Sequence, residues 1–218
     1  MKHGKYIVIE GNDGTGKSTQ AEQLAQWLEE EKKIETFVTH EPDGPGISAE
    51  IRKVIKNGEL ERDGETNLLL FTASRHEIWK RAQHKLSQGK WVISARNYIS
   101  TLVYQGYGEG IDFDRIIATT EEFTDEKYIH PDLTVILGLS HDERERRIAI
   151  ADRGKLENKD TFESRGRDFQ NSLDQGYEKI AEKYNFPIID ASKSIEDIQA
   201  EIRKLIDPAL YAEQDTIR

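Results

Sequence analysis

The residues from Gly11 to Thr19 have the types and the spacing needed to bind a phosphate chain. They contain the pattern Gly11-x4-Gly16-Lys17-Ser18, which is the P-loop signature. Glycines let the backbone curl so that successive N–H groups point inward at an anion, and the positive end of a following helix adds to their field. The Lys17 ammonium can reach outer phosphates, and the Ser18 hydroxyl suits Mg2+. The phosphate-binding candidates are Gly11, Asn12, Asp13, Gly14, Thr15, Gly16, Lys17, Ser18 and Thr19.

Asp13 places a carboxylate inside this anion-binding loop, where it would repel a phosphate. The residue makes sense if its side chain points away from the phosphates, towards a hydroxyl donor or a hydrated metal ion. The alternative is an exposed loop aspartate that has no role.

The segments on either side of the loop have the patterns of a strand and a helix. Residues 6–9 are apolar and rich in β-formers, as in a buried strand, and apolar residues then recur at i, i+3, i+4 and i+7. This second pattern, which predicts a helix, consists of Ala21, Leu24, Ala25 and Leu28.

The rest of the chain alternates between strand-like and helix-like segments, which predicts βαβ units and an α/β fold with a five-stranded, mainly parallel sheet flanked by helices. Helices are expected from an N-cap at Ser48, over 65–88 with Gly89 as the stop, and around 177–184 and 195–206. The remaining strands are expected at 34–40, 91–95, 131–139 and 186–190. We expect one domain over residues 1–218 with a peripheral tail at 208–218.

The composition excludes several classes of partner and site. The formal net charge of −10 argues against nucleic acid and against an anionic membrane surface as partners. Without cysteine the chain has no disulfide, zinc-thiolate site or thiol nucleophile. We find no signal peptide and no apolar stretch long enough to span a membrane, so a cytoplasmic location is expected.

A second set of candidates follows the predicted strands. Ligands of doubly wound sheets bind beyond the carboxyl ends of the strands, so the P-loop should converge with 40–42 and 95–97. Arg96 directly follows a buried strand, where a guanidinium can hold phosphoryl oxygens. Arg52, on the predicted helix after the Glu41 turn, is a second candidate of this kind. The alternative for both is a surface arginine.

Phe71 and Arg75 lie four residues apart on the long predicted helix, hence on one face. An aromatic plane beside a guanidinium can recognise a flat base, because one stacks on it and the other donates to ring oxygens. The alternative is a core phenylalanine with a solvated arginine.

The segment 141–167 is nearly balanced in charge, in contrast to the acidic chain as a whole. Few large apolar residues anchor it, which suits a mobile lid at about residues 147–160 that brings cations to a transferring phosphate. A solvated helical hairpin is the alternative.

Taken together, these motifs resemble the thymidylate kinases (dTMP kinases) over nearly the whole chain. The resemblance rests on ordered blocks: E-G-N-D-G-T-G-K-S-T at 10–19, E-P-D-G at 41–44, I-R at 51–52, L-L-F-T-A-S-R at 69–75, S-A-R-N-Y-I-S-T-L-V-Y-Q-G at 94–106, P-D-L-T at 131–134 and I-D-A-S-K-S-I-E-D-I at 189–198. It implies a three-layer fold of the P-loop NTPase type, a homodimer, and transfer of a phosphoryl group from ATP to dTMP with Mg2+.

The resemblance also implies roles for individual residues. Asp13 would accept the 3′-hydroxyl of dTMP, Arg52 and Arg96 would hold its phosphate, and Tyr104 would crowd the 2′ position. Phe71 would stack on thymine while Arg75 bonds its exocyclic oxygen. The full dTMP-binding set is Asp13, Glu41, Arg52, Phe71, Arg75, Arg96, Ser100, Tyr104 and Gln105.

On the ATP side, the resemblance adds Arg147 to the residues from Gly11 to Thr19. It makes Lys17, Arg96 and the lid residue Arg153 catalytic, and Ser18 and Asp13 the metal-site residues.

The chain departs from the family pattern at four positions. Ala95 stands where the family has an aspartate, His40 where it has an arginine, Gly138 where it has an acid, and Asn158 where it has a lid arginine. Two alternatives stay open, and Ala95, which cannot help to hold hydrated Mg2+, supports only the second. One is a kinase for another nucleoside monophosphate or a deoxynucleoside, and the other is a nucleotide-binding protein with little catalysis.

Overall fold

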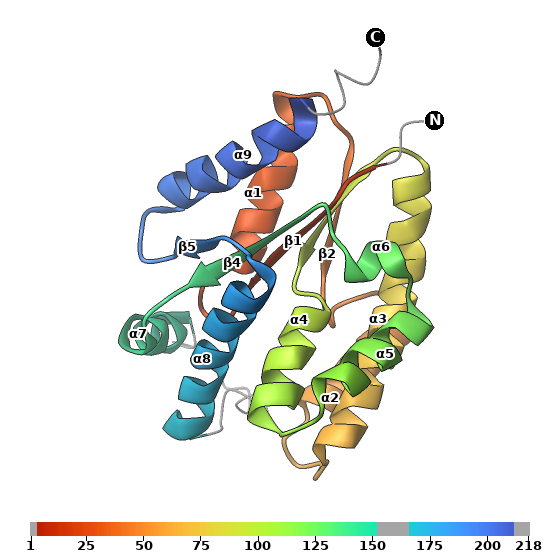
Figure 1. Ribbon diagram of the computed structural model, residues 1–218, viewed down its shortest axis with the longest axis vertical. Helices are drawn as coiled ribbons and strands as arrows, with labels where there is room; N and C mark the ends of the chain where they lie inside the picture. Colours follow the sequence, from red (N-terminus) through yellow and green to blue (C-terminus); the bar gives the residue numbers. More distant parts are fainter. Residues whose placement is uncertain (1–3, 152–165, 212–218) are drawn as a thin grey trace.

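A five-stranded parallel sheet forms the centre of the computed structural model, which describes residues 4–151 and 166–211. The strand order is β2-β3-β1-β4-β5, and every pair of neighbouring strands is parallel (Figure 1). The strands are β1 (Tyr6–Gly11), β2 (Thr36–His40), β3 (Trp91–Ala95), β4 (Leu133–Gly138) and β5 (Ile188–Asp190). The predicted parallel sheet is confirmed, and β2, β4 and β5 are each shorter than expected.

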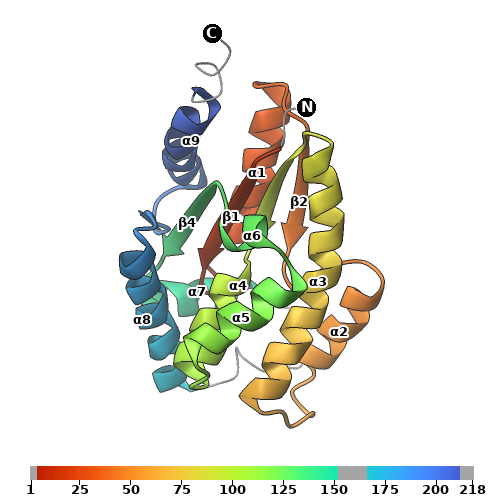
Figure 2. The ribbon, with the colours of Figure 1, turned by 45° about the vertical axis from the view of Figure 1, so that its right-hand side comes forward.

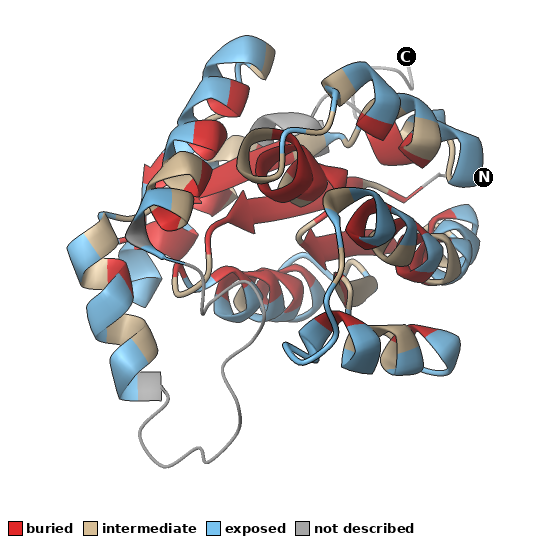
Figure 3. Cartoon of the chain, turned by 90° about the horizontal axis from the view of Figure 1, so that it is seen from below, coloured by how far each residue is buried: buried red, intermediate tan, exposed pale blue. Residues whose placement is uncertain are grey.

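Alternating side chains of the strands build two separate hydrophobic cores. Tyr6 and Val8 belong to one core, whereas Ile7 and Ile9 belong to the other, as the period of two in a strand requires. Helices α1 (Lys17–Glu30) and α9 (Ile195–Tyr211) cover the second face. The first face is covered by α3 (Gly64–Ser87), the π-helix η1 (Leu102–Gly108) and α8 (Arg167–Tyr184). Figure 3 shows the buried strands between these layers.

The shorter helices extend the layer around α3. Helix α2 (Ile47–Lys56) lies beside α3 on its outer side (Figures 1 and 2). The chain then leaves β3 through α4 (Tyr98–Thr101), η1, α5 (Phe113–Phe123) and α6 (Glu126–Ile129). The sequence patterns did not predict these four elements. Within the described residues, no helix is both long and apolar enough to cross a membrane.

Two expectations about helix ends can be checked directly. Gly89 has φ +82 and its N–H bonds to Leu86 O at 2.9 Å, so the predicted stop of α3 is confirmed. The prediction that Ser48 is an N-cap is wrong, because α2 already begins at Ile47. The buried Ser48 hydroxyl instead donates to Ser74 O on α3 at 3.3 Å, and so serves the packing of the two helices.

The expected lid and tail fall partly outside the described residues. Residues 147–151 of the lid belong to α7 (His141–Ala151), and 152–160 lie outside the description. Residues 208–211 of the tail are helical as part of α9, and the rest of the tail lies outside the description.

Strand register brings the predicted site segments to one edge of the sheet. Ala95 at the end of β3 pairs with both Ile9 and His40, and Gly11 pairs with Leu137. The P-loop, the turn after β2 and the Arg96 segment therefore follow neighbouring strand ends.

Candidate active site

The P-loop has the conformation that its glycines predict. Gly14 has φ +80 and Gly16 has φ +89, values that strain residues with a Cβ atom. Helix α1 begins directly after Gly16, at Lys17. The Lys17 ammonium is buried and donates to Asn12 O at 2.7 Å. Burial, together with the nearby Arg96 charge, lowers the pKa of Lys17 to about 7.

Asp13 directs its carboxylate at the Arg96 guanidinium and at the Tyr104 hydroxyl. Oδ1 forms an ion pair with Arg96 Nη2, and Oδ2 accepts from the Tyr104 hydroxyl at 3.2 Å. Lys17 Nζ lies 4.0 Å from the same carboxylate. Burial opposes ionisation, but the charges of Arg96 and Lys17 outweigh it and hold the pKa of Asp13 well below its usual value. Asp13 is thus an ionised acceptor beside the P-loop.

Arg96 is held in place from several directions at the end of β3. Its Nη1 donates to Ser100 Oγ at 2.8 Å and to the Tyr177 hydroxyl at 3.1 Å, and the Tyr104 ring lies 5.4 Å from the guanidinium carbon. The φ of Arg96 is +77, which is uncommon for a residue with a side chain. Burial would lower the pKa of Arg96, but the Asp13 carboxylate raises it well above the ordinary value. The predicted phosphate-holding arginine is therefore a fixed cation.

Glu10 supports this arrangement from the end of β1. Its fully buried carboxylate accepts from the backbone N–H of Asn97 at 2.8 Å and from that of Ser100 at 3.1 Å, and also from Ser100 Oγ at 2.8 Å. These bonds provide acceptors for backbone N–H groups at the start of α4, because the first N–H groups of a helix have no carbonyl acceptor within the helix. Glu10 therefore fixes the segment that carries Arg96 and Ser100.

The Arg75 side chain is buried in the interior, which rules out the alternative of a solvated arginine. It is 2% exposed, and its Nε donates to Glu41 Oε2 at 3.0 Å and to the Tyr128 hydroxyl at 2.8 Å. Nη2 donates to Thr101 Oγ1 at 2.7 Å. Burial opposes the charge, but Tyr128 and Glu41 raise the pKa of Arg75 above its ordinary value. The remaining Nη1 is buried without a hydrogen-bond partner among the described residues, which is costly unless a ligand accepts from it.

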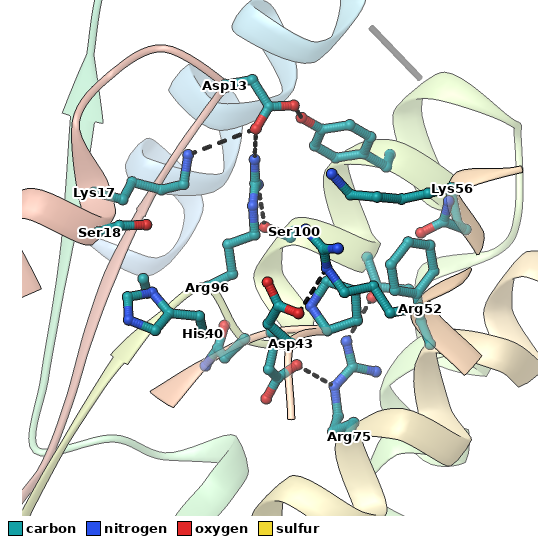
Figure 4. A pocket seen from close by; sticks show the side chains of 18 residues that line it. Asp13, Lys17, Ser18, His40, Asp43, Arg52, Lys56, Arg75, Arg96 and Ser100 are labelled. Atoms are coloured by element: carbon teal, nitrogen blue, oxygen red, sulfur yellow. Dashed lines mark hydrogen bonds and ion pairs between the residues drawn. The ribbon is translucent and has the colours of Figure 1, made fainter. Parts of the chain in front are cut away.

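A cavity of about 200 Å3 opens between the P-loop and α2, α3 and η1 (Figure 4). We call it the strand-end cavity. It is lined by Asp13, Lys17, Ser18, His40, Glu41, Pro42, Asp43, Arg52, Lys56, Phe71, Arg75, Ala95, Arg96, Asn97, Ser100, Thr101, Tyr104 and Gln105. The structure thus brings together all nine residues that the resemblance assigned to the acceptor nucleotide.

The far wall of the strand-end cavity carries further cations. Arg52 Nε forms an ion pair with Asp43 Oδ1 at 2.7 Å, and Lys56, one helical turn later on α2, extends into the cavity (Figure 4). Buried Gln105 donates to Glu109 Oε2 at 3.1 Å. Phe71 lies at the edge of the first hydrophobic core and lines the cavity as well.

Of the two lid candidates, Arg147 does not join this cluster. Arg147 lies on α7, where it donates to Glu143 Oε1 at 2.9 Å and to Ala191 O at 2.8 Å. Arg153 lies outside the described residues.

The sequence patterns missed several partners of the predicted residues. Tyr128 and Thr101 hold Arg75, Tyr177 holds Arg96, and Lys56 lines the strand-end cavity. Lys56 had a signal, since it is four residues after Arg52 and so on the same helical face. Tyr128 and Tyr177 gave no such sequence signal, because they lie on elements far along the chain from Arg75 and Arg96.

Comparisons with known proteins agree with this geometry. The family described as thymidylate kinase matches residues 9–202. The chain belongs to the thymidylate kinase family. The family and the α/β fold expected from the ordered motifs are confirmed.

Individual members of the thymidylate kinase family match over almost their whole length. The thymidylate kinase of Prochlorococcus marinus (strain NATL2A) is 36% identical over 214 residues, covering 93% of this chain and 98% of that protein. The thymidylate kinase of Caldicellulosiruptor saccharolyticus is 34% identical over 209 residues, with coverage of 95% and 98%. The crystal structure of thymidylate kinase from Ehrlichia chaffeensis matches with a TM-score of 0.71 and 27% identity, and covers 94% of this chain and 99% of that one.

For a thymidylate kinase family member, this chain offers few side-chain ligands to a metal ion. Among the described residues, no group of three or more His, Cys, Asp or Glu side chains is placed to hold one. Ala95 contributes only a methyl group to the strand-end cavity, and Glu10 is engaged with the α4 segment. Ser18 and Asp13 do line the cavity with oxygen atoms. That set fits Mg2+, which keeps several waters and is commonly bound through one or two protein oxygens and substrate phosphates.

Proposed function

We propose that the chain transfers the γ-phosphoryl group of ATP to dTMP to give ADP and dTDP. The observation that carries the proposal is the strand-end cavity, which begins at the P-loop and ends at the buried Arg75 Nη1, a donor that has no partner in the described part of the chain. A base carbonyl oxygen would satisfy that donor, and Phe71 on the same helix face offers a ring for stacking.

The cavity residues suit an acceptor that already carries a phosphate. Arg52, Lys56 and Arg96 line it with positive charge, and we assign the acceptor phosphate to them. Asp13 would accept the sugar 3′-hydroxyl, and Tyr104 would crowd the 2′ position. Ser100 and Gln105 complete the acceptor wall near the base, and Glu41 keeps Arg75 in place.

Phosphoryl transfer needs charge neutralisation and in-line positioning more than covalent chemistry. We place the ATP phosphates on the residues from Gly11 to Thr19, with Lys17 as the cation nearest the transferring group. Lys17, Arg96 and the lid residue Arg153 are the proposed catalytic cations, and Arg147 is assigned to the ATP side.

Mg2+ is proposed at Ser18 with Asp13 nearby, where it would neutralise charge on the donor oxygens. The acceptor phosphate is largely ionised near neutral pH, since its second pKa is about 6. A strong general base is therefore unnecessary, and Ala95 does not argue against turnover. The comparisons do not favour the alternative of a weakly catalytic nucleotide-binding protein.

We further propose a cytoplasmic, single-domain enzyme that acts as a homodimer. Support for the dimer comes from an apolar groove of about 530 Å3 lined by residues of α2, α3 and α5. On its rim, Ile47, Leu69 and Phe123 are 57%, 63% and 45% exposed. Exposed apolar patches of this kind mark interaction surfaces.

The test measures ADP release from ATP with four acceptors: dTMP, dUMP, ribothymidine monophosphate and thymidine. We expect dTMP to be the preferred acceptor and thymidine to be inactive. Lys17→Ala should abolish turnover without changing the circular dichroism spectrum. Phe71→Ala should weaken dTMP binding by about 1–3 kcal/mol and leave ATP binding unchanged. A wild-type protein that releases no ADP with any acceptor would refute the proposal.

A further inference from the structure

The amide of Asn12 is held in one orientation by two contacts on opposite sides. Asn12 is 3% exposed, and its Nδ2 donates to Asp174 Oδ1 on α8 at 2.7 Å. Its Oδ1 accepts from the backbone N–H of Asp13 at 2.8 Å. A carboxylate needs a donor and a backbone N–H needs an acceptor, so both contacts require the same orientation of the amide. The oxygen end must therefore face the Asp13 N–H and the nitrogen end Asp174.

That oxygen has a second contact, with the Tyr104 hydroxyl at 3.0 Å. The same hydroxyl lies 3.2 Å from Asp13 Oδ2, so its one proton has two acceptors within reach. Tyr104 is buried and needs a hydrogen-bond partner. If Asp13 Oδ2 turns to a ligand hydroxyl, Asn12 Oδ1 can still accept the hydrogen bond from the Tyr104 hydroxyl. The buried Tyr104 hydroxyl then keeps a hydrogen-bond acceptor.

Asp174 lies near a buried cation on α7. Arg144 is 3% exposed, and its Nε lies 3.9 Å from Asp174 Oδ2. Arg144 also donates to Gln170 Oε1 at 3.0 Å and contacts His141 Nδ1 at 2.9 Å. Its Cγ would lie 3.3 Å from a Cβ atom added at Gly14, so this helix packs directly on the P-loop. None of Asp174, Arg144 and Gln170 lines the strand-end cavity.

We propose that Asp174 is a positioning residue for the acceptor nucleotide. Through Asn12 it keeps an acceptor in front of the Tyr104 hydroxyl, which leaves Asp13 available for the 3′-hydroxyl of the sugar. The inference rests on the proposed function, because it assumes that Asp13 accepts that hydroxyl. It adds that recognition of the sugar depends on a carboxylate on α8 that does not touch the substrate.

The variant Asp174→Asn tests this, because its amide can present an N–H to Asn12 and so compete with the Asp13 N–H for the Asn12 oxygen. The measurement is the dissociation constant of dTMP and of 3′-deoxy-TMP, by calorimetry, on the same protein sample. We expect wild type to prefer dTMP. In Asp174→Asn the constant for dTMP should rise about five- to tenfold, the usual effect of one hydrogen bond, and that for 3′-deoxy-TMP should change less than twofold. Because both ligands are measured on one sample, their ratio does not depend on the folded fraction.

Two further variants complete the test. Asp174→Glu keeps a carboxylate and should restore part of the preference for dTMP. Asp168→Asn removes an exposed carboxylate from the same helix and should leave both constants unchanged. Equal losses for the two ligands in Asp174→Asn, or an unchanged ratio, would overturn the inference while leaving the kinase assignment intact. Wild-type protein that does not bind dTMP at all would instead refute the proposed function.

Discussion

At the scale of single residues, Lys17 is the group whose charge depends most on what occupies the site. Its pKa of about 7 results from burial and from the neighbouring Arg96 charge. In the described structure the ammonium is directed at the Asn12 carbonyl of its own loop. Phosphate oxygens are stronger partners for a cation than a carbonyl, so ATP should raise the Lys17 pKa.

We therefore predict that ATP binding takes up a proton above pH 7. Below pH 7 Lys17 is largely protonated already in the free protein, so it adds little pH dependence to the affinity. Above pH 7 the bound state, whose Lys17 pKa is higher, must gain the proton, and affinity should fall as pH rises. Calorimetry at pH 8 in two buffers of different ionisation enthalpy measures the uptake. The permanently charged Lys17→Arg should show none, and zero uptake in wild type would contradict the prediction.

Ala95 is the second residue with a direct test. It is 2% exposed at the end of β3 and lines the strand-end cavity beside the P-loop. We predict that Ala95→Asp lowers the Mg2+ concentration needed for half-maximal rate, because a carboxylate is a good Mg2+ ligand. Affinity for dTMP should be nearly unchanged. The uncharged Ala95→Asn is the control, and a Mg2+ curve that does not move would show that the metal lies elsewhere.

At the scale of elements, the segment from α4 to α5 positions Tyr104 and Gln105. The π-helix η1 carries both residues, and α5 packs across it. A Cβ atom at Gly106 would lie 2.3 Å from Phe113 Cε1, so the close approach of the two helices requires a glycine at this position. The position of Tyr104 and Gln105 on the cavity wall thus depends on a residue without a side chain, Gly106.

Gly106→Ala should lower the free energy of unfolding by about 1–3 kcal/mol, the usual effect of overpacking. Urea denaturation measures the loss. The same substitution in a Phe113→Ala background, where the ring is gone, should cost much less. Equal losses in both backgrounds would show that the two residues do not clash.

Local spacing explains which parts of this site could be predicted from sequence. Phe71 and Arg75 share a face because they are four residues apart, and Arg96 follows a strand that the apolar run at 91–95 defines. Partners across the fold carry no such signal. Tyr128 is 53 positions from Arg75, and Asp174 is 162 positions from Asn12. Among the helices after Arg96, α5 did have a local signal, since Asp112 caps it and Phe113, Ile116 and Ile117 recur at i, i+3 and i+4. The helices α4 and α6 are too short for a periodic pattern.

At the scale of the whole molecule, the apolar groove between α2, α3 and α5 lies apart from the strand-end cavity. The two share α2 and α3, because Ile51 and Thr72 line the groove while Arg52 and Phe71 line the cavity. A partner on the groove would therefore contact the same helices that hold the acceptor.

We predict that Leu69→Glu converts a dimer into a monomer, because it places a charge at the most exposed apolar position of the groove. Sedimentation velocity at several protein concentrations measures the change. Ile195→Glu, on α9 and outside the groove, introduces the same charge at a 44% exposed residue and should leave the dimer intact. A wild-type protein that sediments as a monomer at every concentration would contradict the proposal.

Among the described residues, three arginines line the strand-end cavity, and each has a carboxylate of its own: Arg96 with Asp13, Arg75 with Glu41 and Arg52 with Asp43. An anion that binds to one of these arginines must therefore compete with an ion pair that already exists. Inorganic phosphate and sulfate can offer the arginines only their negative charge. A nucleotide also has a base and a sugar that contact the cavity. The pairing consequently protects the empty site from the small anions that are abundant in cells, and it should make substrate binding less sensitive to ionic strength than a bare cationic pocket would be.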